Sequence, residues 1–533
     1  MKNNIKIISK RIFTIFLCFG FLSLSSCDDD FGDINKDFKA TIDVRTVTIP
    51  ALYNGLVASL KKNRTEYRIP VAWLYQWNQQ AAMYSASGFL LQDWNDTAWK
   101  SFYTSLANMK DLENLIASQE NPANYANNLA MAKVIMAYKT LRTTLLYGDM
   151  PYTEAGFAFL DNTTYRPKYD SQQSIMEAAI NDLTWAIDNL STGSAQVPLG
   201  SSDVLFSDDI NEWIKFANSL RLRYAMVMIE KNASFADPVI TAALNLPLLA
   251  ANEYVSLAPE TIEDLTHKRD NYYRGNSYIR MGTTMWDAMS STNAVDGSGI
   301  YDLRCPILFE PNKDEEWVPY PQIPDNNTPT VTGNPAHRSR INNYNRQRSN
   351  FASFHAFYML DNSIPQFIVT GSQVSFLMAE IYNRGLAGKA VDHAMAETYY
   401  NAGITASVNF WYNHAFNSAE WKNHKPAAAA PTALEMDGML TDVNVSYSAD
   451  PATALSQIYK QSWISLIHQP FEAWNLQRRT DNATPGVTLP STSLVIDFNR
   501  LTYPNSEQES NRENWTTVTG GTDSEKNKTW IQK

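Results

Sequence analysis

Apolar residues recur every three or four positions over long stretches of the chain, which is the spacing of one face of an α-helix. Residues 208–231 show this most clearly, and their apolar positions fall on one helical face: Ile210, Trp213, Ile214, Ala217, Leu220, Tyr224, Val227 and Met228. Asp209 with Glu212 forms a capping-box start for this helix. A stripe of the same kind predicts a second helix within residues 170–190.

Weaker stripes predict further helices at 98–118, 125–147, 366–384, 389–411 and 453–468. Strand-like alternation is scarce, so the sequence predicts a mainly α fold whose helices follow one another in antiparallel pairs. One pair resembles a tetratricopeptide repeat, with Met378, Ala379 and Tyr382 on its first helix and Ala396 and Tyr400 on its second. Ordinary helix packing explains these spacings equally well.

Helical periodicity mostly fails between about residues 255 and 360. Aromatic residues there alternate with Asn, Asp, Arg, Gly and Pro, and the aromatic positions include Tyr272, Tyr273, Tyr278, Trp286, Tyr301, Trp317, Tyr320 and Tyr344. Long irregular loops in a folded protein are usually functional. We therefore expect a loop-rich insertion on a helical scaffold.

The composition is that of a folded protein with an extensive core. The 533 residues are 44% hydrophobic and 19% charged, and no Gly/Ser-rich or Pro-rich linker divides the chain. Residues 1–26 carry four basic residues and no acid, so their removal changes the formal charge from -11 to -11 - 4 = -15. Such an acidic protein is a poor partner for nucleic acid.

The amino-terminal segment has the features of a signal peptide. Basic residues precede an apolar run, Ile12 to Leu24, of about thirteen residues, which is too short to span a bilayer. The sequence Leu24-Ser25-Ser26-Cys27 resembles a bacterial lipobox, although an ordinary signal followed by a chance cysteine has the same pattern. We predict that residues 1–26 are removed and that Cys27 carries diacylglycerol and an N-acyl lipid such as palmitate. Each buried methylene contributes about 0.8 kcal/mol to membrane binding, so several chains anchor a protein stably.

Familiar catalytic and metal-binding motifs are absent from the sequence. No two of the seven histidines have a metal-binding helical spacing, and there is no HExxH, GxSxG, Walker or GxGxxG pattern. We therefore predict no metal site, no catalytic residues and no cofactor other than the lipid. A pair of carboxylates for glycoside cleavage stays open, because two acids can meet in space without being close in sequence.

Aromatic residues beside amides suggest carbohydrate binding. A sugar ring has a flat apolar face and a rim of hydroxyls, so its site needs a Trp or Tyr platform with polar side chains at the edge. For each single residue, packing in the core is the simpler alternative. The candidate ligand-binding residues are Trp77, Asn78, Tyr84, Trp94, Asn95, Tyr272, Tyr273, Arg274, Trp317 and Tyr320.

Six segments resemble the SusD/RagB family of outer-membrane nutrient-binding lipoproteins, and they occur in the family's order over nearly the whole chain. The segments are FGDINKD after the anchor, LLYGDMPYTEA at 145–155, NEWIKFANSLRLRYAM at 211–226, VSFLMAEIYNRG at 374–385, YKQSWISLIHQPFEAWNLQRRT at 459–480 and FNRLTYPNSEQESN at 498–511. One departure is Phe38, which stands where relatives often have proline.

Within these segments the individual residues suggest structural roles. Gly148 is expected to supply a turn, and Glu472 is expected to pair with Arg478 or Arg479. A sulfate- or sialate-binding role for the two arginines is the alternative. Tyr503 is expected to pack in the interior.

The resemblance implies a tetratricopeptide-like helical scaffold with a loop-rich ligand-binding portion. On this view residues 27–533 form one SusD-like body, with a scaffold at about 40–255 and 360–480, an insertion at about 255–360 and closing loops at 480–533. It also implies a non-catalytic protein that binds a glycan at the cell surface and delivers it to a SusC-like TonB-dependent transporter of the outer membrane. Asp28, Asp29 and Asp30 resemble a surface-export signal. Peptide capture and a surface-tethered glycoside hydrolase are the alternatives.

Overall fold

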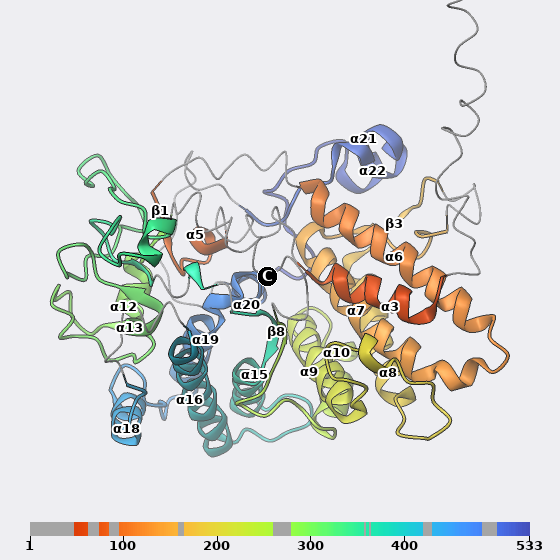
Figure 1. The fold of residues 1–533 in the computed structure, drawn as a ribbon, viewed down its shortest axis with the longest axis horizontal. Helices are drawn as coiled ribbons and strands as arrows, with labels where there is room; N and C mark the ends of the chain where they lie inside the picture. The colour runs from red at the N-terminus through yellow and green to blue at the C-terminus, as the bar shows by residue number, and fades with distance from the viewer. Residues whose placement is uncertain are drawn as a thin grey trace, which may run out of the picture. The chain divides into compact units, whose positions relative to one another are not determined.

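Antiparallel helices make up most of the computed structural model, which describes residues 47–61, 74–84, 95–157, 165–258, 279–355, 359–361, 364–418, 429–481 and 498–532 (Figure 1). The chain divides into two units, Met1–Ala51 and Leu52–Lys533. The first unit contributes only residues 47–51 to the described part, including the start of α3 (Ile49–Ser59). The fold described below is that of the second unit.

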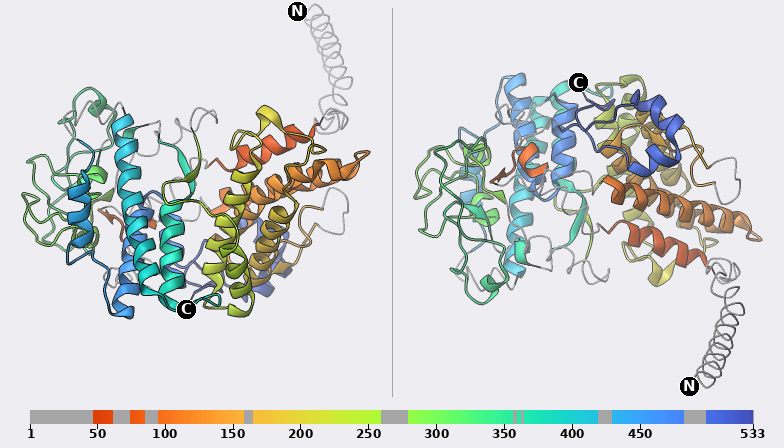
Figure 2. Two further views of the ribbon diagram at one scale, coloured as in Figure 1. Left: turned by 90° about the horizontal axis from the view of Figure 1, so that it is seen from below. Right: turned by 90° about the horizontal axis from the view of Figure 1, so that it is seen from above.

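The long helices pack in two series. The first series is α6 (Asn95–Ala117), α7 (Ala126–Tyr147), α8 (Gln172–Asn189), α9 (Ile210–Met228) and α10 (Ala233–Leu244), in which each helix contacts the next. The second series is α15 (Gly371–Arg384), α16 (His393–Asn417), α19 (Pro451–Ser465) and α20 (Pro470–Arg479). Figure 2 shows the second series as neighbouring cyan to blue helices. The predicted mainly α fold built from helical pairs is confirmed.

The other helices are short. They are α5 (Tyr75–Trp77), η5 (Pro122–Tyr125), η7 (Gly200–Ser202), α12 (Thr283–Met289), α13 (Cys305–Leu308), η8 (Arg338–Ile341), α18 (Ala433–Thr441), η9 (Leu466–His468), α21 (Asn505–Ser510) and α22 (Arg512–Thr519). No helix in the described ranges is both long enough and apolar enough to cross a membrane.

Strands occur in the described residues only as four antiparallel two-stranded ribbons. The pairs are β1 (Ala82–Met83) with β5 (Ile279–Arg280), β2 (Met150–Pro151) with β3 (Tyr169–Asp170), β4 (Tyr254–Leu257) with β8 (Gln366–Thr370), and β6 (Phe309–Glu310) with β7 (Ser353–Phe354). The helix predicted from residue 366 begins instead at Gly371. The preceding residues are rich in β-branched and aromatic side chains and pair as β8, and Thr370 caps α15 by accepting from the backbone N–H of Gln373.

Helix ends follow the local chemistry of the sequence. The Asp209 side chain accepts from the backbone N–H groups of Asn211 and Glu212, and so it caps α9 as predicted. Gly148 ends α7 with a φ of 84°, a conformation that suits glycine, and this confirms the predicted turn.

The α15–α16 pair packs through small residues against large ones. Ala379, Ala396 and Tyr400 are fully buried between the helices. A Cβ atom at Gly403 of α16 would come within 3.0–3.1 Å of the Phe376 ring on α15, so glycine permits the close approach. The two helices that resemble a tetratricopeptide pair, α15 and α16, therefore pack closely against each other.

Three of the segments that carry the family resemblance meet at the carboxyl end of α7. Arg478 donates to the carbonyl oxygen of Leu145 at 2.8 Å, and Arg500 donates to that of Tyr147 at 2.8 Å. The two cations thus satisfy carbonyl groups that the helix end leaves without intrahelical partners. Tyr503 is buried against Trp99, with ring centroids 5.6 Å apart, which confirms its predicted packing role.

Residues 279–355 form a loop-rich segment with only short helices and strands among them. In Figure 1 this segment, drawn in green, lies beside α16 and α19 and away from α6 to α10. The irregular structure expected here is present.

Candidate functional site

Two segments far apart in the sequence, 74–84 and 279–323, join to form the candidate site. The β1–β5 ribbon pairs Ala82 with Arg280. The Thr284 hydroxyl donates to the Gln79 side-chain oxygen at 2.8 Å, and the Gln322 amide donates to the Ala81 carbonyl at 3.1 Å. Because these bonds are buried, they fix the two segments against each other. The structure thereby joins the segment that carries Trp77 and Tyr84 to the segment that carries Trp317 and Tyr320.

Trp317 has a half-buried ring that packs against the protein interior. Its indole stacks on the buried Trp286, with ring centroids 5.8 Å apart and an interplanar angle of 15°. Gly297 has a φ of 78°, and a Cβ atom there would lie 2.7 Å from Trp317 Nε1. The backbone N–H of Trp317 donates to the Val295 carbonyl at 2.7 Å. The ring is therefore held in place before any ligand arrives, which reduces the entropy lost on binding.

Tyr84 is a second half-buried ring, and a buried cation supports it. The guanidinium carbon of Arg280 lies 4.7 Å from the centre of the Tyr84 ring. Arg280 also donates to Ser349 Oγ at 2.9 Å and to the Gly333 carbonyl at 3.1 Å. Burial lowers the pKa of Arg280 to about 10, so the side chain is still a cation at neutral pH.

The other predicted site residues differ in how far their side chains are buried. Trp77 is half-buried on α5. Asn78 is fully buried and donates to the Pro470 carbonyl at 3.0 Å, so the structure gives it a packing role. Tyr320 is also buried, with its ring 5.0 Å from that of Phe351 and 6.4 Å from that of Tyr84. Their burial follows from these interior partners, which lie far away in the sequence.

The remaining predictions fall on residues for which little or nothing is described. Trp94, Tyr272, Tyr273 and Arg274 lie outside the described residues, as do Cys27 and Asp28 to Asp30. For Asn95, only its backbone position as the first residue of α6 is described. Among the predicted residues whose side chains are described, Trp77, Tyr84 and Trp317 are therefore the ones that are partly accessible to solvent.

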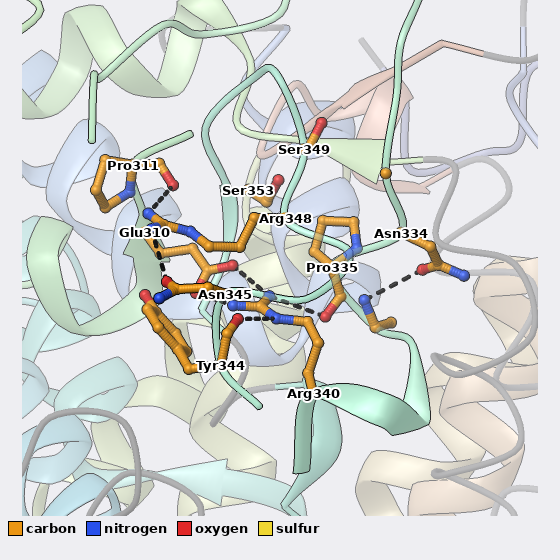
Figure 3. Close-up of polar contacts among 12 residues, drawn as sticks. Glu310, Pro311, Asn334, Pro335, Arg340, Tyr344, Asn345, Arg348, Ser349 and Ser353 are labelled. Atoms are coloured by element: carbon orange, nitrogen blue, oxygen red, sulfur yellow. Dashed lines mark hydrogen bonds and ion pairs between the residues drawn. The ribbon is translucent and has the colours of Figure 1, made fainter. Parts of the chain in front are cut away.

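A buried ion pair braces the loops next to this site (Figure 3). Arg340 donates to both carboxylate oxygens of Glu310, at 2.5 and 3.0 Å, and both side chains are buried. The guanidinium groups of Arg340 and Arg348 lie 4.8 and 5.0 Å from the centre of the Tyr344 ring. Arg348 in turn pairs with Glu315. These contacts hold irregular backbone that has little regular hydrogen bonding of its own.

The acids of the described loop-rich segment do not form a buried catalytic pair. Its two buried carboxylates are Asp302 and Glu310, and each accepts from a buried arginine, Arg304 and Arg340 respectively. Over the described ranges, no cluster of three or more His, Cys, Asp and Glu side chains could hold a metal ion.

The sequence analysis missed a cavity of about 560 Å³ that lies between α16 and the β4–β8 ribbon. Polar residues at every fourth position of α16 line it: Asn401, Thr405, Asn409, Asn413 and Asn417. This regular spacing is visible in the sequence and could have indicated a polar face on that helix.

Comparison with known proteins identifies the family. A model of a SusD-like family described as starch-binding and associating with the outer membrane matches residues 39–504. The fold is similar to that of a chitin-binding protein, with 21% identity, a TM-score of 0.68 and coverage of 91% of this chain and 100% of that one.

Two further solved structures agree. A SusD homolog from Parabacteroides distasonis has 19% identity and a TM-score of 0.67, with 91% of this chain and 98% of that one covered. A chitin-binding SusD homolog from Flavobacterium johnsoniae has 18% identity and a TM-score of 0.63, with the same two coverages. Comparison with curated proteins gives no significant match. The family model covers most of the sequence and the fold agrees with it, so this chain belongs to the SusD-like family.

Proposed function

We propose that the protein is a cell-surface lipoprotein that binds an oligosaccharide or polysaccharide and delivers it, without cleaving it, to a SusC-like TonB-dependent transporter of the outer membrane. The observation that carries the proposal is the joining of segments 74–84 and 279–323. This joining supports the proposal because the segment that carries the half-buried rings of Trp77 and Tyr84 is bonded to the segment that carries the half-buried ring of Trp317. Similar folds whose names describe chitin binding support the class of ligand.

The chemistry of the region favours an uncharged ligand. The apolar face of a sugar ring stacks well on a fixed indole such as Trp317. Two buried ion pairs lie in the adjoining loops, Glu310 with Arg340 and Asp302 with Arg304, while the buried Arg280 donates to Ser349 and to the Gly333 carbonyl and lies against the Tyr84 ring. The two ion pairs therefore offer a charged ligand no free countercharge, and Arg280 is already engaged by protein partners.

The attachment to the membrane belongs to the same proposal. A lipidated Cys27 would anchor the protein to the outer membrane, and Asp28 to Asp30 would direct it to the outer face. Peptide capture differs from glycan capture in its ligand alone, so a glycan array and a peptide mixture tested in parallel separate the two.

Trp317→Ala is expected to weaken glycan binding by about 1–3 kcal/mol, the range for loss of an anchoring aromatic side chain. The reason is that the substitution removes a ring that is already fixed against Trp286 and so binds at a low entropy cost. Isothermal titration calorimetry of residues 28–533 with starch- and chitin-derived oligosaccharides measures the change.

A matched control for this experiment is Trp185→Ala. Trp185 is 36% exposed on α8, outside both segments of the site, so its loss should leave the affinity unchanged. Thermal unfolding of each variant checks that the fold is retained. If Trp317→Ala, Trp77→Ala and Tyr84→Ala all bind as the unsubstituted protein does, the site is assigned wrongly.

A further inference from the structure

The cavity on α16 is separate from the aromatic site. Its walls come from residues 401–417 of α16, the turn before β4, the junction of β8 with α15, and the region of η9. None of its lining residues belongs to segment 74–84 or 279–323. Its volume of about 560 Å³ lies within the usual range of ligand-binding pockets, roughly 300–1,000 Å³.

One wall of the cavity is a row of uncharged polar side chains. Residues four apart are neighbours on a helix surface, and the row from Asn401 to Asn417 therefore runs along the helix for about 24 Å. Asn409, Asn413 and Asn417 are exposed, and their side chains form no hydrogen bond with another residue of the described part. The side-chain oxygen of Asn401 is buried without a hydrogen-bond partner there. Such a buried acceptor is costly unless something donates to it.

An exposed aromatic ring also lines the cavity. Tyr254 is 42% exposed at the start of β4, and it is held edge-on by the rings of Phe410 and Phe367, at centroid distances of 5.3 and 5.7 Å. Phe410 lies on α16 next to Asn409, so the aromatic wall borders the amide row. A fixed ring beside a row of amides combines a stacking surface with donors and acceptors.

The charge of the lining selects among ligand classes. No lysine, arginine or aspartate is among the described residues that line the cavity. Its one glutamate, Glu253, is already engaged by Lys215 at 2.8 Å and by the backbone N–H of Ala250 at 2.7 Å. The lining also holds two histidines, His414 and His468, which pack against aromatic rings of the cavity wall. Phosphate and carboxylate groups find no lysine or arginine among these residues, and an ammonium group finds only an already paired carboxylate, whereas hydroxyl groups find many amide partners.

We propose that this cavity is a second saccharide-binding site, which takes an uncharged oligosaccharide along the α16 row with Tyr254 as its stacking platform. The inference relies on the proposed function only for the class of ligand. Two sites on one protein would hold a long glycan at two points, which raises the overall affinity when both are engaged.

The test compares four forms of residues 28–533: the unsubstituted protein, Trp317→Ala, Asn409→Ala/Asn413→Ala and the triple combination. The two asparagines are exposed and without described partners, so their loss should not disturb folding. Binding of starch- and chitin-derived oligosaccharides is measured by titration calorimetry. Asn409→Ala/Asn413→Ala is expected to weaken one set of sites about tenfold, and the triple variant to weaken both.

Two further variants complete the design. Tyr254→Ala should reproduce the effect of the asparagine pair. Thr398→Ala/Thr441→Ala changes exposed helical residues outside the cavity lining and should have no effect. Unchanged affinity and stoichiometry in both cavity variants, with binding lost in Trp317→Ala, would overturn the second site and leave the proposed function intact. Binding that survives Trp317→Ala and is lost in the cavity variants would support the second site and contradict the first. No binding by the unsubstituted protein would contradict both.

Discussion

Glu380→Gln is expected to lower the free energy of unfolding by about 3–5 kcal/mol, the cost of breaking a buried ion pair. Glu380 is 1% exposed on α15 and accepts from Arg479 of α20 at 2.6 and 3.0 Å and from Arg384 at 2.8 Å. Tyr459 of α19 donates to the same carboxylate at 2.9 Å. Glutamine keeps the volume of the side chain but leaves Arg479, itself 4% exposed, without its countercharge.

The same substitution should change how stability depends on pH. Burial alone would raise the pKa of Glu380, but Arg479, Arg384 and the Tyr459 hydroxyl outweigh it and hold the pKa below its ordinary value of 4.5. A carboxyl group whose pKa is lower in the folded state stabilises that state above its unfolded pKa. This contribution is lost as the pH falls below 4.5 through the folded value. The unsubstituted protein should therefore lose stability towards acid more steeply than Glu380→Gln.

Urea unfolding at neutral and acidic pH measures both effects. Glu230→Gln is the control, because Glu230 also pairs with Arg384 but its side chain is 19% exposed, so a smaller loss is expected. A loss below about 1 kcal/mol for Glu380→Gln, or an unchanged pH dependence, would contradict the role given to this carboxylate.

Glu310→Gln is expected to lower stability by a similar amount, about 3–5 kcal/mol, and to loosen the loops beside Trp317. Its carboxylate and the Arg340 guanidinium are both buried and pair through two bonds. Without that charge, Arg340 is left as a buried cation under the Tyr344 ring. Urea unfolding measures the loss, and limited proteolysis within residues 311–350 reports the loosening.

Glu315→Gln provides the comparison within the same network. Glu315 pairs with Arg348, which also lies against the Tyr344 ring, but the Glu315 side chain is 68% exposed. Exposed pairs contribute about 0–1 kcal/mol, so this variant should unfold and resist protease nearly as the unsubstituted protein does. Equal effects of Glu310→Gln and Glu315→Gln would show that burial of the pair is not what braces the loops.

The helical scaffold could be predicted because its signals are local. A stripe of apolar residues and a cap at Asp209 define α9, and Gly148 marks the end of α7. The start of the helix predicted from residue 366 was wrong, because a short apolar stretch suits a strand as well as a helix. Only its pairing with β4, more than a hundred residues earlier, makes it β8.

Partners distant in sequence could not be predicted in this way. Glu472 was expected to pair with Arg478 or Arg479. It lies 3.5 Å from Arg223 instead, and Arg479 pairs with Glu380, 99 residues earlier. Arg478 and Arg479 are buried in these structural contacts, which argues against the sulfate- or sialate-binding alternative.

The candidate site shows the same limit. Trp77 and Asn78 are adjacent, yet one is half-buried and the other is fully buried with Pro470, 392 residues away, as its partner. In irregular backbone no period tells which side chains face solvent. Composition could therefore suggest the type of ligand, but the fold was needed to select the residues.

The most direct test of the account is binding by residues 28–533 to neutral polysaccharides, measured together with the release of reducing ends over the same incubation. The account predicts saturable binding to a starch- or chitin-type glycan, no increase in reducing ends, and weaker binding by Trp317→Ala than by Trp185→Ala. Sustained release of reducing ends, or binding to a peptide mixture and to none of the glycans, would contradict it.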